Sequence, residues 1–301
     1  MKQTYILTSL LCLATLLMPG CTSPIGSGDD PSSSTLAINF GTPQADTRAA
    51  VNSSADMGEF SVWGWYGKDG TNSYNVFDNE TVSRSGNSWD YTGGTRYWIP
   101  GYEYNFYGVY PVKIGSCTAD GLITVNNFDC SNFGEDAVDL MTATATGDGN
   151  NPQPVAMEFK HLLAKVNIVA TVEGGNCTVT SATFSGMAIK GNYNSSAGWT
   201  DTTTGSFTNS ESKVLNTTGT DLLGDLLLIP QTVTDEFKIK VSYTLDGKEQ
   251  TPKEITLPTS INQWDAGQSY KYTLTFKGNN IIFTVNVASW GHSTGGIITV
   301  E

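Results

Sequence analysis

From residue 58 onward the chain is a succession of short runs in which apolar and polar residues alternate, and no stretch keeps a helical period. Glycine, asparagine, aspartate and proline separate these runs, which include 59–67, 102–110, 236–245 and 269–276. Successive side chains of a strand point to opposite faces of a sheet, so each such run can bury one face. Many short strands with frequent turn residues are typical of an antiparallel sandwich or barrel. The sequence therefore predicts an all-β protein.

The strongest linker signal inside this pattern is TGDGNNPQP at 146–154, after which the alternation resumes. About 280 residues follow residue 21, enough for two ordinary domains. The sequence predicts two tandem antiparallel β-sandwich domains, an N-terminal one over 49–152 and a C-terminal one over 153–301.

The first twenty residues have the layout of a signal peptide. Lys2 supplies a basic start, residues 5–18 are apolar, and Pro19 and Gly20 precede Cys21. The apolar run is shorter than the roughly 20 residues that a membrane-spanning helix needs, although a permanent span is the alternative. Residues 1–20 are therefore predicted to be a lipoprotein signal peptide, with a lipid attached at Cys21.

Residues 21–48 are predicted to form a lipidated tether that ends in a first strand. Residues 22–34 are rich in Pro, Gly and Ser, whereas Leu36, Ile38 and Phe40 alternate with smaller or polar residues. Arg48 is the only basic residue between Cys21 and Lys68. It offers one target to an arginine-specific or trypsin-like protease, whose product would begin at Ala49. The alternative is a chance arginine in a loop.

The composition argues against several classes of function. A formal net charge of −13 at pH 7 repels phosphate backbones, so no nucleic-acid partner is expected. The two histidines, His161 and His292, belong to no metal-binding motif, and no nucleophile elbow or phosphate loop is present. We expect no catalytic residue, metal or cofactor, and no enzymatic activity. A secreted hydrolase with a carboxylate pair assembled in three dimensions is a remaining alternative.

Tyr102, Tyr104 and Phe106 are expected to project from one face of a strand. Large aromatic residues on a regular strand face are more often core, which is the preferred interpretation. If these rings were exposed, they could stack on pyranose rings. The alternative function is then a permanently anchored outer-membrane lipoprotein that binds surface glycans.

Cys117, Cys130 and Cys177 remain once the leader and the lipid site are set aside, and an odd number of thiols cannot all pair internally. Cys117 and Cys130 flank a candidate strand and could form a disulfide in an oxidising envelope. Buried, unpaired thiols that behave as small apolar residues are the preferred alternative.

Several segments, in order along nearly the whole mature chain, resemble the fimbrillin family of Bacteroidetes pili. They are the leader ending in Cys21, Thr47-Arg48-Ala49, AVDLMTATA (137–145), FKHLLAKVNIVA (159–170), LLLIPQ (226–231), WDAGQSYKYTLTF (264–276) and IIFTVNVASW (281–290).

The resemblance implies two transthyretin-like β-sandwich domains in a structural or adhesive pilus subunit at the cell outer membrane or surface, in a fimbrium. It implies a transient lipid anchor in the outer membrane and proteolytic cleavage after Arg48. Removal of the strand that carries Leu36, Ile38 and Phe40 would leave a groove for a strand of a neighbouring subunit. Expected partners are other pilus subunits, either copies of this chain or related fimbrillins, and a receptor on a host or bacterial surface.

The candidate donor strand consists of Ile297, Ile298, Thr299 and Val300, which follow Gly295 and Gly296. Alternating apolar residues complement an open sheet edge. The alternative is that these four residues form the last strand of their own domain. A tail this short also leaves a stalk, tip or anchor position open.

Overall fold

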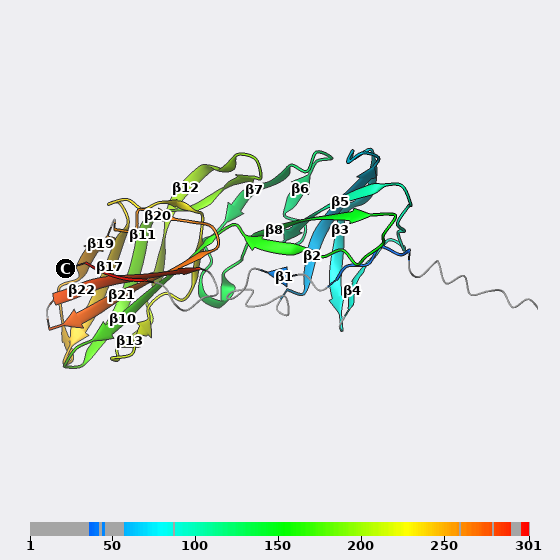
Figure 1. Ribbon diagram of the computed structural model, residues 1–301. Helices are drawn as coiled ribbons and strands as arrows, with labels where there is room; N and C mark the ends of the chain where they lie inside the picture. Colours follow the sequence, from blue (N-terminus) through cyan, green and yellow to red (C-terminus); the bar gives the residue numbers. More distant parts are fainter. Residues whose placement is uncertain are drawn as a thin grey trace, which may run out of the picture. The chain divides into compact units, whose positions relative to one another are not determined.

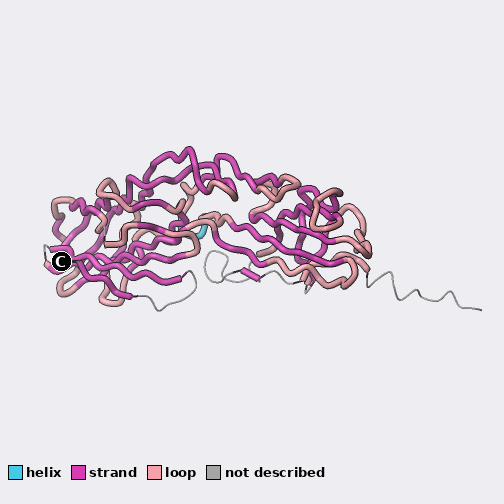
Figure 2. Tube along the Cα trace, turned by 45° about the horizontal axis from the view of Figure 1, so that its top comes forward, coloured by secondary structure: helices cyan, strands magenta, loops and turns pink. Residues whose placement is uncertain are grey.

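The computed structural model describes residues 36–41, 44–45, 57–86, 88–258, 260–278, 280–289 and 296–300. Within them, strands follow one another along the chain with one 3₁₀ turn, Gly134–Asp136, and no α-helix (Figure 2). The described part of the chain has no helix that is long and apolar enough to cross a membrane. The all-β prediction is confirmed. The predicted signal peptide, Cys21, Arg48 and Ala49 lie outside the described residues.

One sheet is built almost wholly from the first half of the chain, in the order β1-β9-β8-β5-β2-β3-β4 (Figure 1). Its pairs are antiparallel except for β1 with β9, which is parallel. Its strands are β1 (Gln44–Ala45), β2 (Glu59–Gly67), β3 (Tyr74–Ser85), β4 (Ser88–Tyr91), β5 (Glu103–Tyr110), β8 (Met141–Asp148) and β9 (Glu158–His161).

Strand β2 buries side chains on both faces, which explains its nearly continuous apolar sequence. Phe60 and Val62 enter a core cluster of this sheet, whereas Trp63 and Trp65 enter a second cluster with residues from later strands. The register against β3 shifts on both sides of Gly64, where a Cβ atom would lie 2.9 Å from Val76 and 3.0 Å from Phe106. Glycine therefore lets the strand bulge where neighbouring side chains leave no room for a Cβ atom.

Two further sheets use mainly the second half of the chain. The first has the order β18-β17-β11-β7-β6, with β12 and β13 on β11 and β19 on β17. Its strands are β6 (Gly115–Cys117), β7 (Ile123–Asp129), β11 (Cys177–Asn194), β12 (Gly198–Asn209), β13 (Lys213–Val214), β17 (Lys238–Leu245), β18 (Lys248–Glu249) and β19 (Lys253–Thr256).

The second sheet has the order β14-β10-β21-β22-β23, with β15 on β10, and its β10–β21 pair is parallel. Its strands are β10 (Ala164–Val172), β14 (Thr220–Asp221), β15 (Leu226–Leu228), β21 (Gln268–Lys277), β22 (Asn280–Ser289) and β23 (Gly296–Val300). A short pair, β16 (Gln231–Thr232) with β20 (Gln263–Trp264), completes the described strands.

The largest core cluster contains side chains from both of these sheets. Val166 and Tyr272 come from one sheet, and Phe184 and Ile239 come from the other. All four side chains are fully buried. Two sheets that bury a common apolar layer form a sandwich.

The predicted boundary between residues 152 and 153 falls between two strands that pair with each other. β8 precedes it and β9 follows it, and Met141 is opposite His161 in their ladder. β7, which also precedes the boundary, pairs with β11. The boundary itself stays a prediction.

The three described cysteines, Cys117, Cys130 and Cys177, are free. Burial raises the pKa of Cys117 and of Cys130 to about 12 in each case, and aspartates nearby add to the effect. These thiols stay protonated at neutral pH, which agrees with the interpretation as small apolar residues.

Candidate functional site: the seat of the N-terminal segment

The N-terminal segment, which we define as residues 36–41, lies between the two ends of the first sheet. Phe40 forms an antiparallel bridge with Trp89 of β4 and a parallel bridge with Val155, just before β9. Ala37 bridges Tyr97, and β1 continues the contact along β9. β4 ends the sheet on one side and β9 with β1 ends it on the other. Residues 36–41 therefore close the sheet upon itself.

Backbone hydrogen bonds hold the segment on both sides. Ile38 N–H donates to the Arg96 carbonyl at 2.8 Å, and Trp98 N–H donates to the Leu36 carbonyl at 2.7 Å. On the opposite side, Val155 N–H donates to the Asn39 carbonyl at 2.8 Å, and Gly41 N–H donates to the Val155 carbonyl at 2.9 Å. The segment is thus bonded like a central strand, although only isolated bridges are formed.

The alternation predicted for this segment is present in its burial. Ile38 is 0% exposed and Phe40 5% exposed, whereas Asn39 points to solvent. Leu36, the third predicted apolar residue, is half-buried.

Phe40 is enclosed by four aromatic rings from four strands. The ring centroids of Phe60, Phe77, Tyr91 and Phe106 lie 5.5–6.2 Å from that of Phe40, and the interplanar angles are 64–90°. Edge-to-face pairs at such distances are favourable beyond their buried area. The inner face of the segment therefore fills a pocket shaped for an aromatic ring.

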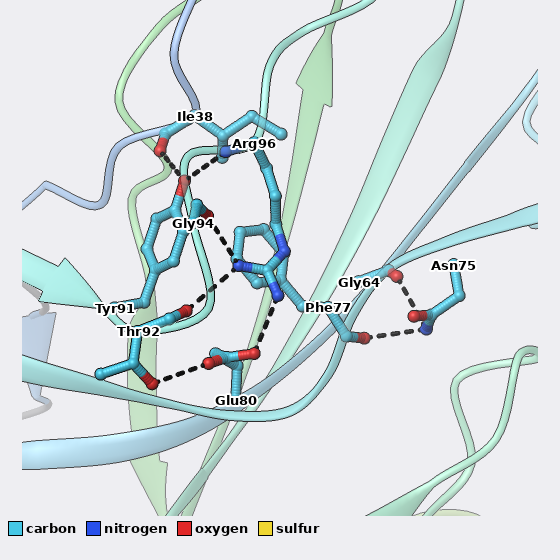
Figure 3. A network of polar contacts seen from close by, with 9 residues as sticks. All are labelled: Ile38, Gly64, Asn75, Phe77, Glu80, Tyr91, Thr92, Gly94 and Arg96. Atoms are coloured by element: carbon cyan, nitrogen blue, oxygen red, sulfur yellow. Dashed lines mark hydrogen bonds and ion pairs between the residues drawn. The ribbon is translucent and has the colours of Figure 1, made fainter.

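A polar network receives the backbone of Ile38 (Figure 3). The Tyr91 hydroxyl donates to the Ile38 carbonyl at 2.9 Å and accepts the Arg96 N–H at 3.1 Å. Burial raises the pKa of Tyr91, partly offset by its hydrogen bond with the Arg96 backbone, so the phenol stays protonated and able to donate.

The Arg96 side chain braces this network. Its Nη2 lies 2.9 Å from Glu80 Oε2, and its Nη1 donates to the carbonyls of Thr92 and Gly94. The guanidinium carbon lies 4.7 Å from the Phe77 ring centroid and 5.2 Å from that of Tyr91. A planar fork that stacks on rings and bonds several acceptors is a role for arginine that lysine cannot fill.

We call the groups that receive the segment the seat. Its backbone contacts are independent of sequence, whereas its aromatic rings contact the side chain of Phe40. The seat comprises Phe60, Phe77, Glu80, Trp89, Tyr91, Arg96, Trp98, Phe106 and Val155. Within the described ranges, no three His, Cys, Asp or Glu side chains gather to hold a metal ion. The arrangement can bind an extended strand.

Sequence reasoning found the occupant but missed the polar part of the seat. Glu80, Tyr91 and Arg96 belong to no motif, and they meet only because β3, β4 and the following loop fold together. The one available signal was the rarity of arginine, since Arg96 is one of three in the chain.

The aromatic run of β5 is core, and the glycan-stacking alternative is wrong for two of its three residues. Tyr104 is 1% exposed and Phe106 0% exposed, so neither offers a face to a sugar. Tyr102 is half-buried and packs edge-on against Tyr66, with ring centroids 5.4 Å apart.

The candidate donor residues lie in β23, an edge strand antiparallel to β22. Ile297 is opposite Asn286, and Val300 is opposite Phe283. This is the position expected for the last strand of the chain's own sheet, and the donor role stays a proposal.

His161 forms a buried pair with Asp139. Its Nδ1 lies 2.6 Å from Asp139 Oδ2, and both side chains are almost wholly buried. Burial raises the pKa of Asp139, and the hydrogen bond and charge of His161 partly oppose this rise. The pair is 22 residues apart in sequence, so no local pattern could have revealed it.

Solved structures with this fold come from species of Bacteroides. A fimbrial protein from Bacteroides vulgatus matches with 18% identity and a TM-score of 0.64, over 85% of this chain and 99% of that one. A candidate cell adhesion protein from Bacteroides ovatus matches with 15% identity and a TM-score of 0.58, over 86% and 98%. Another from Bacteroides uniformis matches with 19% identity and a TM-score of 0.54, over 85% and 97%. At these identities the likeness shows a shared fold.

A comparison with curated proteins finds no match. The family described as fimbrillin-like matches residues 47–290, well over half of the chain. This range includes every strand from β2 to β22 and all residues of the seat. The chain belongs to the fimbrillin-like family.

Proposed function

We propose that the chain is a structural or adhesive subunit of a surface pilus, exported with its own N-terminal segment occupying the seat. The observation that carries this proposal is the position of residues 36–41, which close the first sheet between β4 and β9. Membership of the fimbrillin-like family supports it, as does the likeness to a fimbrial protein from Bacteroides vulgatus.

In this scheme the chain reaches the outer membrane as a lipoprotein acylated at Cys21. A protease then cuts after Arg48, three residues beyond the end of β1. The cut separates the N-terminal segment and β1 from the rest of the chain. A strand of a neighbouring subunit replaces them and joins the two subunits.

The energetics of the seat favour replacement over spontaneous loss. Burial of Ile38 and Phe40 is worth ~1.5–3 kcal/mol each, and four backbone hydrogen bonds add ~0.5–1.5 kcal/mol each. The gross contribution is roughly 5–12 kcal/mol before the cost of ordering the strand. In this scheme the cut segment keeps these contacts until a competing strand displaces it. Subunits would not circulate with an open edge.

The first test is the N-terminal residue of the protein recovered from the cell surface. Mass spectrometry is expected to find Ala49 in surface fibres. Recovery of only acylated Cys21 would contradict the proposal and support a permanently anchored lipoprotein.

A second test uses Arg48→Ala, which is expected to abolish high-mass, SDS-resistant ladders on gels of surface material. The matched control is Arg84→Ala, at an exposed position at the end of β3, which should leave the ladders intact. Equal ladders from both variants would count against cleavage at Arg48.

A further inference from the structure

We infer that the seat selects a strand carrying an aromatic residue two positions after an aliphatic one. Because β23 has no aromatic residue, the strand comes from a subunit with a different sequence and not from β23 of a second copy of this chain. The inference rests on the proposed replacement of the N-terminal segment and adds the chemistry of the partner strand.

The aromatic preference follows from the walls of the Phe40 pocket. Phe60, Phe77, Tyr91 and Phe106 come from β2, β3, β4 and β5, neighbours whose backbone ladders fix their spacing. Such walls cannot close readily around a smaller side chain. An aliphatic residue at this position leaves ring edges without contacts, and a polar one is buried without a partner.

The register follows from the backbone contacts. The Arg96 carbonyl and the Tyr91 hydroxyl bind the two polar groups of Ile38, and Val155 binds Asn39 and Gly41 on the other side. An incoming strand that makes the same bonds must point the side chains equivalent to 38 and 40 inward. A slip of one residue would turn the opposite set inward.

β23 does not meet this requirement. The inward pairs that it could offer, two positions apart, are Gly296 with Ile298, Ile297 with Thr299 and Ile298 with Val300. Each places a threonine or an aliphatic residue where the seat holds Phe40. β23 also pairs with β22 over five positions, and those pairs would be lost if it left its own sheet.

The test is a strand-exchange assay on the full chain cut after Arg48, with three fluorescent peptides. One carries residues 36–45, the second is the same with Phe40→Ile, and the third carries residues 293–301. Fluorescence anisotropy reports binding, and mass spectrometry reports displacement of the cut fragment. The first peptide is expected to bind. The other two are expected to bind with an affinity at least about tenfold lower. Equal binding of the second or third peptide would overturn the inference and leave the exchange scheme standing.

A measurement on the uncut chain separates the two proposals. Phe40→Ile is expected to lower the thermal unfolding midpoint, whereas Val214→Ala, at a side chain 71% exposed, should not. An unchanged midpoint in Phe40→Ile overturns the aromatic selection. Failure of all three peptides to bind contradicts strand exchange, and with it both proposals.

Discussion

At the scale of single residues, the Arg96 side chain shapes the seat although its guanidinium does not bond the N-terminal segment. The guanidinium pairs with Glu80, donates hydrogen bonds to two loop carbonyls and stacks on the rings of Phe77 and Tyr91. What reaches the N-terminal segment is the Arg96 backbone, held in position by these contacts.

Arg96→Lys is therefore expected to destabilise the protein although the charge is kept. A lysine can still pair with Glu80 but cannot bond the carbonyls of Thr92 and Gly94 at the same time. We expect a loss of about 1–2 kcal/mol in the free energy of unfolding, measured by urea denaturation. Arg84→Lys is the control, because Arg84 lies at an exposed position near the end of β3, where substitutions usually change stability little. Equal effects of the two substitutions would contradict the bracing role.

The buried Asp139 gives the protein a pH-dependent stability. Burial raises the pKa of its carboxyl, with His161 opposing the rise, so the folded state binds a proton more tightly than the unfolded state. Between the ordinary carboxyl pKa of about 3.9 and the raised value, this contribution to stability is lost as pH increases.

Asp139→Asn removes this titration. The free energy of unfolding of the native protein, relative to that of Asp139→Asn, is expected to fall with rising pH in that window, by at most ~1.4 kcal/mol per pH unit. Urea denaturation at a series of pH values measures it, with Asp235→Asn at an exposed site as control. A difference that is constant with pH would show that burial does not raise this pKa.

At the scale of elements, the N-terminal segment connects two edges of the first sheet, as a central strand connects its two neighbours. It has hydrogen bonds on both sides, to the stretch after β4 and to the stretch before β9. Without it, both stretches become open edges.

Deletion of residues 36–45 is expected to increase amide hydrogen exchange in β4, in the loop through Trp98 and in β9. The reason is that their partners for pairing are gone, whereas β10 and β21 keep their eight paired positions. Mass-spectrometric hydrogen exchange measures this by peptide. Added peptide 36–45 should restore protection at β4 and β9. Unchanged protection there would mean that the segment does not hold the edges closed.

At the scale of the whole molecule, the two halves of the sequence share a sheet and a core cluster. β7 pairs with β11, and the third core cluster joins Trp63 of β2 and Val125 of β7 with Leu227 of β15. Shared strands and shared burial couple the unfolding of the parts that they connect.

We therefore expect a single unfolding transition. Far-ultraviolet circular dichroism and tryptophan fluorescence should report the same midpoint for residues 36–301. The calorimetric enthalpy should equal the van't Hoff enthalpy. Two separated midpoints would show that the predicted domains unfold independently.

Much of this organisation was predictable from local patterns. Period-two alternation predicted an all-β chain and the inward positions of Ile38 and Phe40, because strand geometry alone decides which side chains share a face. Turn residues and the absence of a helical period excluded helices for the same local reason.

Tertiary structure decided which strands the segment lies between and whether a shared face is covered. The alternation of Tyr102, Tyr104 and Phe106 was compatible with a core or with an exposed platform, and only packing against other strands buried the last two. Arg96 meets Ile38 across 58 positions of sequence, by a bond that depends on how strands pair. Pairing is set by contacts between distant segments, and local alternation carries no information about the partner.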